Sequence, residues 1–345
     1  MMFASVQPHE YVLRHDGRVM SEALFGDRVV RFLYSQTREM APFLFRLFTG
    51  KRFCGVIGTL NFDLPLAPRL LGSKGFLKSC GVDLEECLES PESFDTPRKI
   101  FERKIRYETA RPMDKDPRVV VSPADARALV GSLESASALF IKNKFFTLEE
   151  LLGREKWLHV FEGGDFAIFR LTPEKYHFNH TPVSGRVVDI YEINGAFHSC
   201  NPSAVVELVT PYSKNRRVVT VIDTDVEGGS GVGRVAMVEV VALMIGEVVQ
   251  AYSSKAYDDP RPVSPGDFVE KGRPKSLYRP GSSTDILLFE PDRVTFDEDL
   301  VQNLRRADVH SRFTLGFAHP LAETEVNVRA TVARRHPESS TSISF

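Results

Sequence analysis

The sequence has few cysteines and no long apolar run. Its four cysteines among 345 residues show no CxxC spacing. This argues against a disulfide framework or a zinc site and favours a reducing compartment. No stretch reaches the roughly 18–20 apolar residues of a membrane-spanning helix. The N-terminus lacks the apolar region of a signal peptide. We therefore expect a cytoplasmic protein without a membrane span, and we expect no metal site.

An excess of one charge is also missing. The chain has 44 basic and 46 acidic residues, a formal net charge of -2. Because nucleic-acid binding depends on a basic surface field, we expect no nucleic-acid partner. The hydrophobic content of 42% is sufficient for a substantial core in one large or two smaller domains.

Residues 22–72 have the pattern of amphipathic helices in which aromatic and aliphatic residues alternate with arginines, as in "DRVVRFLYSQTREMAPFLFRLFTGKRF". One interpretation is a helical layer that packs on the main domain. The other is an element that lies peripherally on a membrane surface, where its cations meet anionic headgroups. The two interpretations are compatible. We assign residues 1–112 to this helical N-terminal region.

Residues 113–330 are expected to be mainly β and to form the catalytic domain, followed by a polar tail at 331–345. The one convincing helix signal inside this domain is "FTLEELLG". The predicted fold class is α+β, an N-terminal helical layer on a mainly antiparallel β core that resembles a sandwich or barrel. Runs rich in β-branched residues predict strands at 118–123, 137–142, 166–171, 185–193, 204–210, 217–223, 232–251 and 286–289.

The glycine-rich loop "VEGGSGVGRVAMVEV" could suggest a phosphate-binding loop. Such a loop should lead into a helix, but the residues after it are β-branched and typical of a strand. We therefore interpret it as a hairpin loop.

Three histidines lie close together in sequence: His177, His180 and His198. They have no HExxH motif and no carboxylate or cysteine at ligand spacing, so a structural role is favoured over metal binding. If the segment is extended, His177 and His180 point to opposite faces and could serve different purposes.

"YRPGSSTDILLFE" places Gly281-Ser282-Ser283 just before the predicted buried strand at 286–289. Asp125, in "VSPAD", taken alone suits a turn. A serine, a histidine able to take its proton and an aspartate able to orient that histidine together fit the logic of a catalytic triad. The strand-to-helix elbow of hydrolases is absent.

An ordered series of segments resembles the phosphatidylserine decarboxylase family over roughly residues 90–320. These segments are "FERKI…ARPM", "VSPAD", "IKNKFFTLEELLG", "YHFNHTPVSGRV", "INGAFHSCNP", "KNRRVVTVIDT", "VGRVAMVEVVALMIGEV", "VEKG" and "GSS". The resemblance implies a self-cleaving proenzyme that converts phosphatidylserine to phosphatidylethanolamine and carbon dioxide. It also implies a covalently bound pyruvoyl group as cofactor.

The resemblance assigns roles residue by residue. Cleavage would fall between Gly281 and Ser282, and Ser282 would be the self-cleaving nucleophile that becomes the pyruvoyl group. His180 would be the general base, Asp125 would orient His180, and His177 would handle substrate or donate a proton. The two fragments would stay associated, and a homodimer is compatible with the sequence.

Some positions depart from the family pattern: "RPGSS" replaces the usual "LGST", and Ala126 replaces a glycine. These departures leave two alternatives open. One is a soluble pyruvoyl-dependent decarboxylase of a free, for example aromatic, amino acid. The other is a non-catalytic β-scaffold that binds lipid or a partner through residues 22–72.

Overall fold

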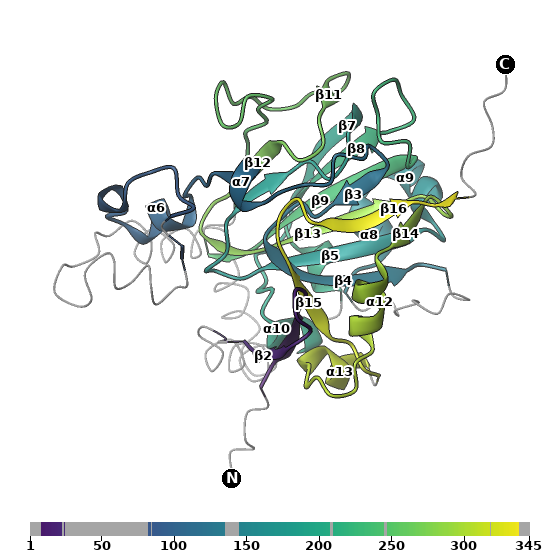
Figure 1. The fold of residues 1–345 in the computed structure, drawn as a ribbon. Helices are drawn as coiled ribbons and strands as arrows, with labels where there is room; N and C mark the ends of the chain where they lie inside the picture. Colours follow the sequence, from purple (N-terminus) through teal and green to yellow (C-terminus); the bar gives the residue numbers. More distant parts are fainter. Residues whose placement is uncertain are drawn as a thin grey trace, which may run out of the picture.

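The computed structural model describes residues 8–22, 24, 82–83, 85–134, 145–207, 210–244, 247–317 and 319–337. Nearly all of the amphipathic region at 22–72, and the predicted strand at 137–142, lie outside these residues. The described part contains one large sheet, two small sheets and several short helices (Figure 1).

The large sheet has ten strands and is antiparallel except where β1 pairs in parallel with β15. The strand that carries Ser282, β13, lies between β9 and β5 near the middle of the sheet (Figure 1). The order does not close on itself, so the sheet is open within the described residues rather than a barrel. From edge to edge the strands are β11 (Phe268–Val269), β7 (Gly185–Ile193), β8 (Arg217–Asp223), β9 (Arg234–Met244), β13 (Gly281–Phe289), β5 (Asp165–Leu171), β4 (Ala126–Ser132), β15 (Glu323–Val326), β1 (Glu10–Leu13) and β2 (Val19–Ser21).

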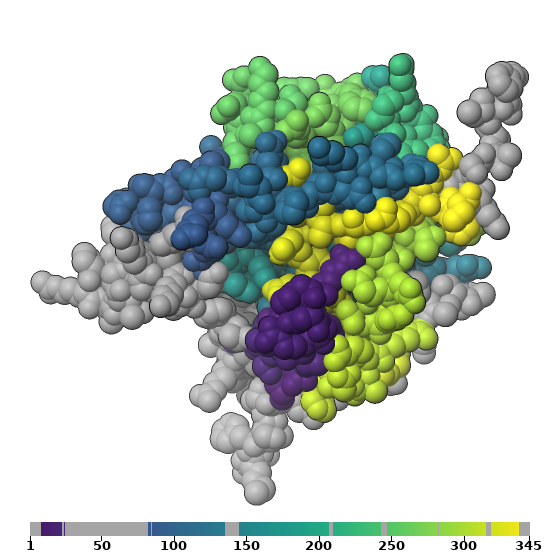
Figure 2. Space-filling view, viewed as in Figure 1, coloured from purple at the N-terminus to yellow at the C-terminus, as the bar shows by residue number. Residues whose placement is uncertain are grey.

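Two three-stranded antiparallel sheets complete the β structure. The first consists of β10 (Val248–Gln250), β12 (Pro274–Tyr278) and β6 (Phe178–His180). The second consists of β14 (Val294–Phe296), β16 (Thr331–Arg335) and β3 (Val119–Val121). Figure 2 shows the C-terminal strand in yellow alongside the blue segment that contains β3.

The helices are short, and several begin at recognisable caps. The Thr96 side chain accepts a hydrogen bond from the Lys99 backbone at the start of α6. At the start of α8, the Thr147 side chain accepts from the Glu150 backbone. The described helices are the 3-10 turn η2 (Pro91–Ser93), α6 (Pro97–Phe101), α7 (Tyr107–Ala110), α8 (Leu148–Leu152), α9 (Glu155–Phe161), α10 (Pro202–Glu207), α11 (Pro211–Lys214), α12 (Glu298–Leu304) and α13 (Arg312–Phe317).

Two predictions about the β-rich region were wrong. Residues 204–210 were expected to form a strand, but α10 spans most of them. Asn201 Oδ1 accepts from the Ser203 backbone and Pro202 begins the helix, so these local signals outweigh the β propensity of the valines. The second wrong prediction was that "FTLEELLG" would be the one helix of this region. It is confirmed as α8, but α9–α13 are helices as well, and their lengths of four to seven residues left little periodicity to detect.

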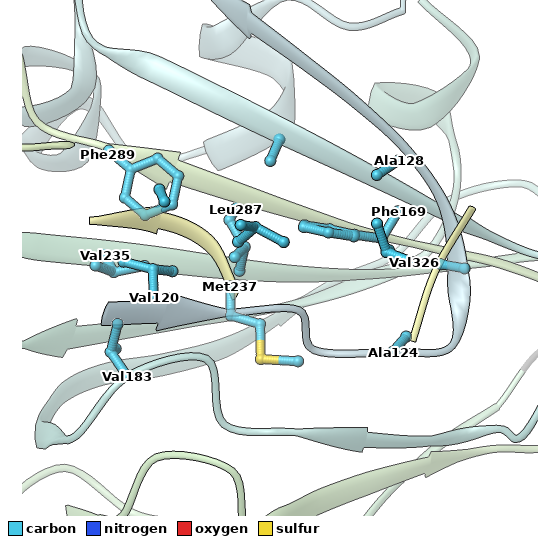
Figure 3. Close-up of a cluster of buried hydrophobic side chains, with 14 of the residues drawn as sticks. Val120, Ala124, Ala128, Phe169, Val183, Val235, Met237, Leu287, Phe289 and Val326 are labelled. Atoms are coloured by element: carbon cyan, nitrogen blue, oxygen red, sulfur yellow. The ribbon is translucent and has the colours of Figure 1, made fainter. Parts of the chain in front are cut away.

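Both faces of β13 are buried, which confirms the prediction of a buried strand. Leu287 and Phe289 enter one hydrophobic cluster together with residues of the second small sheet. Ile286 and Leu288 enter the other cluster, to which α8–α11 and α13 contribute. Figure 3 shows Leu287 and Phe289 in the first cluster. The small sheets therefore cover one face of the large sheet and helices cover much of the other.

The glycine-rich loop joins β8 to β9 as an antiparallel hairpin, as predicted. Gly228, Gly231 and Gly233 have positive φ, so the turn depends on glycine there.

Candidate active site

The two predicted histidines lie at opposite ends of the strand β6: His177 directly precedes it and His180 is its last residue. His177 stacks on Phe101 with ring centroids 3.5 Å apart, whereas His180 meets the edge of Tyr107 at 4.8 Å. Phe101 belongs to the core of the large sheet and Tyr107 to a separate cluster. The prediction that these histidines face opposite sides of an extended segment is confirmed.

Both ring nitrogens of His180 have partners. Nδ1 lies 2.9 Å from the carbonyl oxygen of Gly272, and Nε2 lies 2.9 Å from the hydroxyl of Tyr176. Because a carbonyl only accepts, Nδ1 carries the hydrogen and Nε2 accepts from Tyr176. Burial lowers the pKa of His180 to about 3, so the ring is neutral and Nε2 has a lone pair.

Gly272 can hold His180 in this tautomer because of its backbone conformation. Its φ is 75°, and an added Cβ would lie 2.4 Å from the sulfur of Met113. Glycine adopts such a left-handed conformation without strain, whereas a side chain there would be strained and would displace Met113. The carbonyl of Gly272 thus fixes the tautomer of the ring that Asp125 was expected to orient.

Asp125 lies in the same region but has other hydrogen-bond partners. Its carboxylate accepts from Arg111 Nε at 3.0 Å and Nη2 at 2.9 Å, and from the backbone of Val328 at 2.7 Å. No hydrogen bond joins it to His180 within the described residues. Its negative charge acts to raise the pKa of His180, against the larger effect of burial. The proposed orienting role therefore stays a prediction.

The backbone around Ser282 is irregular. Gly281 pairs with Met244 and Ser283 with Val241, so two residues of β9 lie opposite Ser282 alone. Such bulges are frequent beside active sites. The Ser282 side chain lies outside the described part of the structure. The neighbouring Ser283 is buried, and its Oγ has no hydrogen-bond partner among the described residues.

His177 is the histidine closer to the cleavage segment along β12. The backbone nitrogen of Tyr278 donates to the His177 carbonyl at 3.1 Å. Tyr278 lies four residues before Ser282, so the chain from Tyr278 to Ser282 spans at most about 14 Å. His180 pairs instead with Pro274, eight residues before Ser282. How either ring approaches the Ser282 hydroxyl therefore stays a prediction.

The His177 ring is completely buried, and neither nitrogen has a partner of full hydrogen-bond geometry within the described residues, although a backbone group of Lys175 acts to raise its pKa. Burial, reinforced by the positive charge of Arg103, holds its pKa well below the ordinary value, so the ring is neutral. Buried polar atoms rarely lack partners, so these nitrogens are available to a ligand or water.

Sequence reasoning did not assign roles to Tyr176, Gly272, Arg111 or Phe101. The first three belong to the segments "YHFNH", "VEKG" and "ARPM", which carried the resemblance, so their positions were signalled but their contacts were not. Phe101 stands in "FERKI". Their contacts join segments far apart in the chain, which a single sequence does not reveal.

One buried cluster of ligand-type side chains lies away from these histidines. His9, Glu22 and Glu323 bring donor atoms within 4.8 Å of one another. Arg170 Nη2 lies 2.6 Å from Glu22 and 2.5 Å from Glu323, and Arg127 Nε lies 3.2 Å from Glu22, so two guanidinium groups already balance the two carboxylates. This arrangement is an ion-pair network rather than a metal centre.

Comparison with known proteins identifies the family. A family profile described as "Phosphatidylserine decarboxylase" matches residues 98–313. The chain is similar to a protein named "Phosphatidylserine decarboxylase proenzyme" from Fusobacterium nucleatum, with 26% identity over 92% of this chain and 97% of the relative. A protein of the same name from Chlamydia trachomatis is 32% identical over 84% of this chain and 90% of the relative.

A third relative, "Phosphatidylserine decarboxylase proenzyme 3" from Schizosaccharomyces pombe, is 32% identical over 71% of this chain, which corresponds to 24% of that longer protein. The chain therefore belongs to the phosphatidylserine decarboxylase family. Within the described residues, none of the helices combines the length and the apolar character needed to cross a membrane.

Proposed function

We propose that this protein is a self-cleaving, pyruvoyl-dependent carboxy-lyase that converts phosphatidylserine to phosphatidylethanolamine and carbon dioxide. Its family membership and the proenzyme names of its relatives support this activity. The observation that carries the proposal is the position of Gly281-Ser282 at the start of the central strand β13, opposite an irregular stretch of β9.

Self-cleavage requires a base and a rearrangement of one peptide bond. The Ser282 hydroxyl loses its proton and its oxygen attacks the Gly281 carbonyl carbon, which converts the peptide bond to an ester. Removal of the Ser282 α-proton then expels the Gly281 carboxylate and leaves dehydroalanine. Addition of water and loss of ammonia convert this residue to the pyruvoyl group, with Gly281 as the new C-terminus of the larger fragment.

His180 is the proposed base, and Nε2 is the atom that would accept the proton. The Gly272 carbonyl keeps the hydrogen on Nδ1, and Tyr176 is the neighbour through which a proton can reach Nε2. Asp125 would favour the protonated ring through its negative charge, which Arg111 holds in place.

The pyruvoyl carbonyl supplies an electron sink for decarboxylation of an amine-bearing substrate. The buried, unpartnered polar atoms of His177 and Ser283 fit a site that receives such a polar group. His177 is the residue we assign to substrate handling and proton delivery. Its ring is neutral in the free protein, and the negative charges of a phosphatidylserine headgroup would favour the protonated, donating form.

The smaller fragment would remain bound after cleavage. Residues 282–345 supply β13 between β9 and β5, and β15 between β4 and β1. They also supply two strands of a small sheet, as well as α12 and α13. Separating the fragments would open the large sheet in two places and expose its core.

The lipid would be reached from an anionic membrane surface to which the protein binds peripherally in the cytoplasm. The amphipathic, arginine-rich sequence at 22–72 supports this part of the proposal. The excess of arginine and lysine over acidic residues in this sequence matches the negative charge of a lipid headgroup.

Release of carbon dioxide tests the substrate. Phosphatidylserine in detergent micelles should release carbon dioxide, and borohydride, which reduces a pyruvoyl carbonyl, should abolish the release. Free amino acids, including aromatic ones, serve as the matched substrate control. Turnover of a free amino acid without turnover of the lipid, or activity that survives borohydride, would contradict the proposal.

A further inference from the structure

Arg279 and Pro280 connect β12 to β13, and together with Gly281, the first residue of β13, they immediately precede the bond at Gly281-Ser282. Cleavage at that bond turns them into a chain end. Chain ends fray unless side chains or backbone groups hold them. The contacts of Arg279 therefore determine where this end lies after cleavage.

Arg279 is held from two directions. Its Nη1 lies 2.6 Å from Glu102 Oε2, and its backbone nitrogen donates to the Glu247 carbonyl at 2.9 Å. Its Nε lies 3.9 Å from the Glu247 carboxylate. Glu102 also pairs with Arg98 at 3.1 Å. Pro280 has a fixed φ, which further restricts the segment.

The partner of Arg279 follows the helix that covers His177. Glu102 directly follows Phe101, the last residue of α6, whose ring stacks on His177 at 3.5 Å. Arg103, the next residue, donates to the carbonyls of Ile100 and Glu174 and is buried. The ion pair thus joins the cleavage segment to the element that packs on the proposed substrate-handling histidine.

Cleavage also changes the charge at this place. A new carboxylate forms at Gly281, two residues from Arg279, where Glu102 and Glu247 already contribute two negative charges. Arg279 and Arg98 balance those two charges before cleavage. Without Arg279, one of these two negative charges would be uncompensated, and it would repel the new carboxylate.

We propose that the Arg279–Glu102 ion pair holds the cut end of the larger fragment against α6 and thereby keeps Phe101 stacked on His177. This inference rests on the proposed self-cleavage. Arg279 is then a positioning residue that acts after cleavage, through α6. The unusual "RP" before "GSS" has a physical purpose in this account, because arginine supplies the ion pair and proline stiffens the end.

The experiment compares Arg279→Gln, Glu102→Gln, the double variant and Arg279→Lys with the wild-type protein. Arg261→Gln serves as the control, because it removes a different arginine–carboxylate pair, Arg261–Asp267 at 2.7 Å. Intact mass gives the cleaved fraction. A carboxypeptidase that accepts proline then reports how accessible the Gly281 end is, and carbon dioxide release per pyruvoyl group reports turnover.

We expect all variants to cleave as fully as wild type. The end should be trimmed roughly tenfold faster in Arg279→Gln and Glu102→Gln, as expected for loss of one charge-assisted hydrogen bond. Glu102→Gln leaves the trimmed sequence unchanged, so faster trimming there cannot arise from protease preference. Turnover per pyruvoyl should fall by a similar factor in both single variants and no further in the double variant. Arg279→Lys should restore part of it.

The possible failures are distinguishable. An uncleaved wild-type chain would overturn the proposed function itself. Cleaved wild type with trimming and turnover unchanged in both single variants would overturn the ion-pair role alone. Loss of cleavage in Arg279→Gln would also overturn it, because the residue would then act before the bond is broken.

Discussion

Replacing Asp285 with asparagine should stabilise the folded protein by an amount that grows as the pH rises. Asp285 on β13 lies directly opposite Glu239 on β9, and both side chains are fully buried. Lys275 Nζ lies 2.7 Å from Glu239 Oε2, so the lysine neutralises that carboxylate. Asp285 has only the Tyr278 hydroxyl at 2.8 Å, and its Oδ2 lacks a partner among the described residues.

Burial, and then the nearby charge of Glu239, raises the pKa of Asp285 well above its ordinary value of 3.8. A folded pKa above the unfolded one means that the folded state binds the extra proton. The stability from this proton is fully present below the unfolded pKa and is lost as the pH rises to the folded pKa. The loss amounts to about 1.4 kcal/mol per pH unit in that window.

Asparagine resembles the neutral acid in shape and has no proton to lose. The free energy of unfolding of Asp285→Asn, minus that of its parent, should therefore increase with pH between about pH 5 and pH 7, with a slope of up to about 1.4 kcal/mol per pH unit. The measurement is urea unfolding at several pH values. Both proteins carry Ser282→Ala, which keeps a single uncleaved chain suitable for two-state analysis.

Two features make this test specific. The buried histidines titrate in both proteins, so their effect cancels in the difference. A constant offset from altered packing does not change the slope with pH. A difference that stays constant across this pH range would refute the reasoning, because it would mean that Asp285 is ionised in the folded protein.

Three further predictions concern other buried groups. Lys275→Met should lower the free energy of unfolding by about 3–5 kcal/mol, because the buried carboxylate of Glu239 loses its cation. The double variant with Glu239→Gln should recover part of this loss in urea unfolding. His177→Gln should cleave fully by intact mass but lose roughly 10²–10⁴-fold in carbon dioxide release; unchanged turnover would remove it from the site. Tyr176→Phe removes the donor to His180 Nε2 and should slow cleavage, measured by time-resolved intact mass. It should also lower the free energy of unfolding in urea by about 1–3 kcal/mol. Cleavage at the wild-type rate would exclude Tyr176 from proton transfer to His180.

The parts of the fold set by local pattern were predictable from sequence. The run at 286–289 is buried on both sides because the small sheets cover one face of β13 and helices cover the other, and its apolar continuity reflects that. The period of two in an extended segment placed His177 and His180 on opposite faces. The β-branched residues after the glycine-rich loop correctly indicated a hairpin.

Other features depend on contacts that local pattern does not encode. The carbonyl that holds His180 belongs to Gly272, 92 residues further along the chain, and a backbone carbonyl has no side-chain signature. Arg111, the partner of Asp125, could equally have been a solvated arginine. In α10, one asparagine cap and one proline outweighed a run of β-branched residues, because tertiary context overrides weak propensities.

The central claim is that the bond between Gly281 and Ser282 is broken by the protein itself. Intact-mass analysis of the purified wild-type protein should give two fragments, one ending at Gly281 and a smaller one beginning with a pyruvoyl group in place of Ser282. Ser282→Ala, prepared in the same way, should give one full-length chain. An active wild-type protein that remains a single full-length chain would contradict the account.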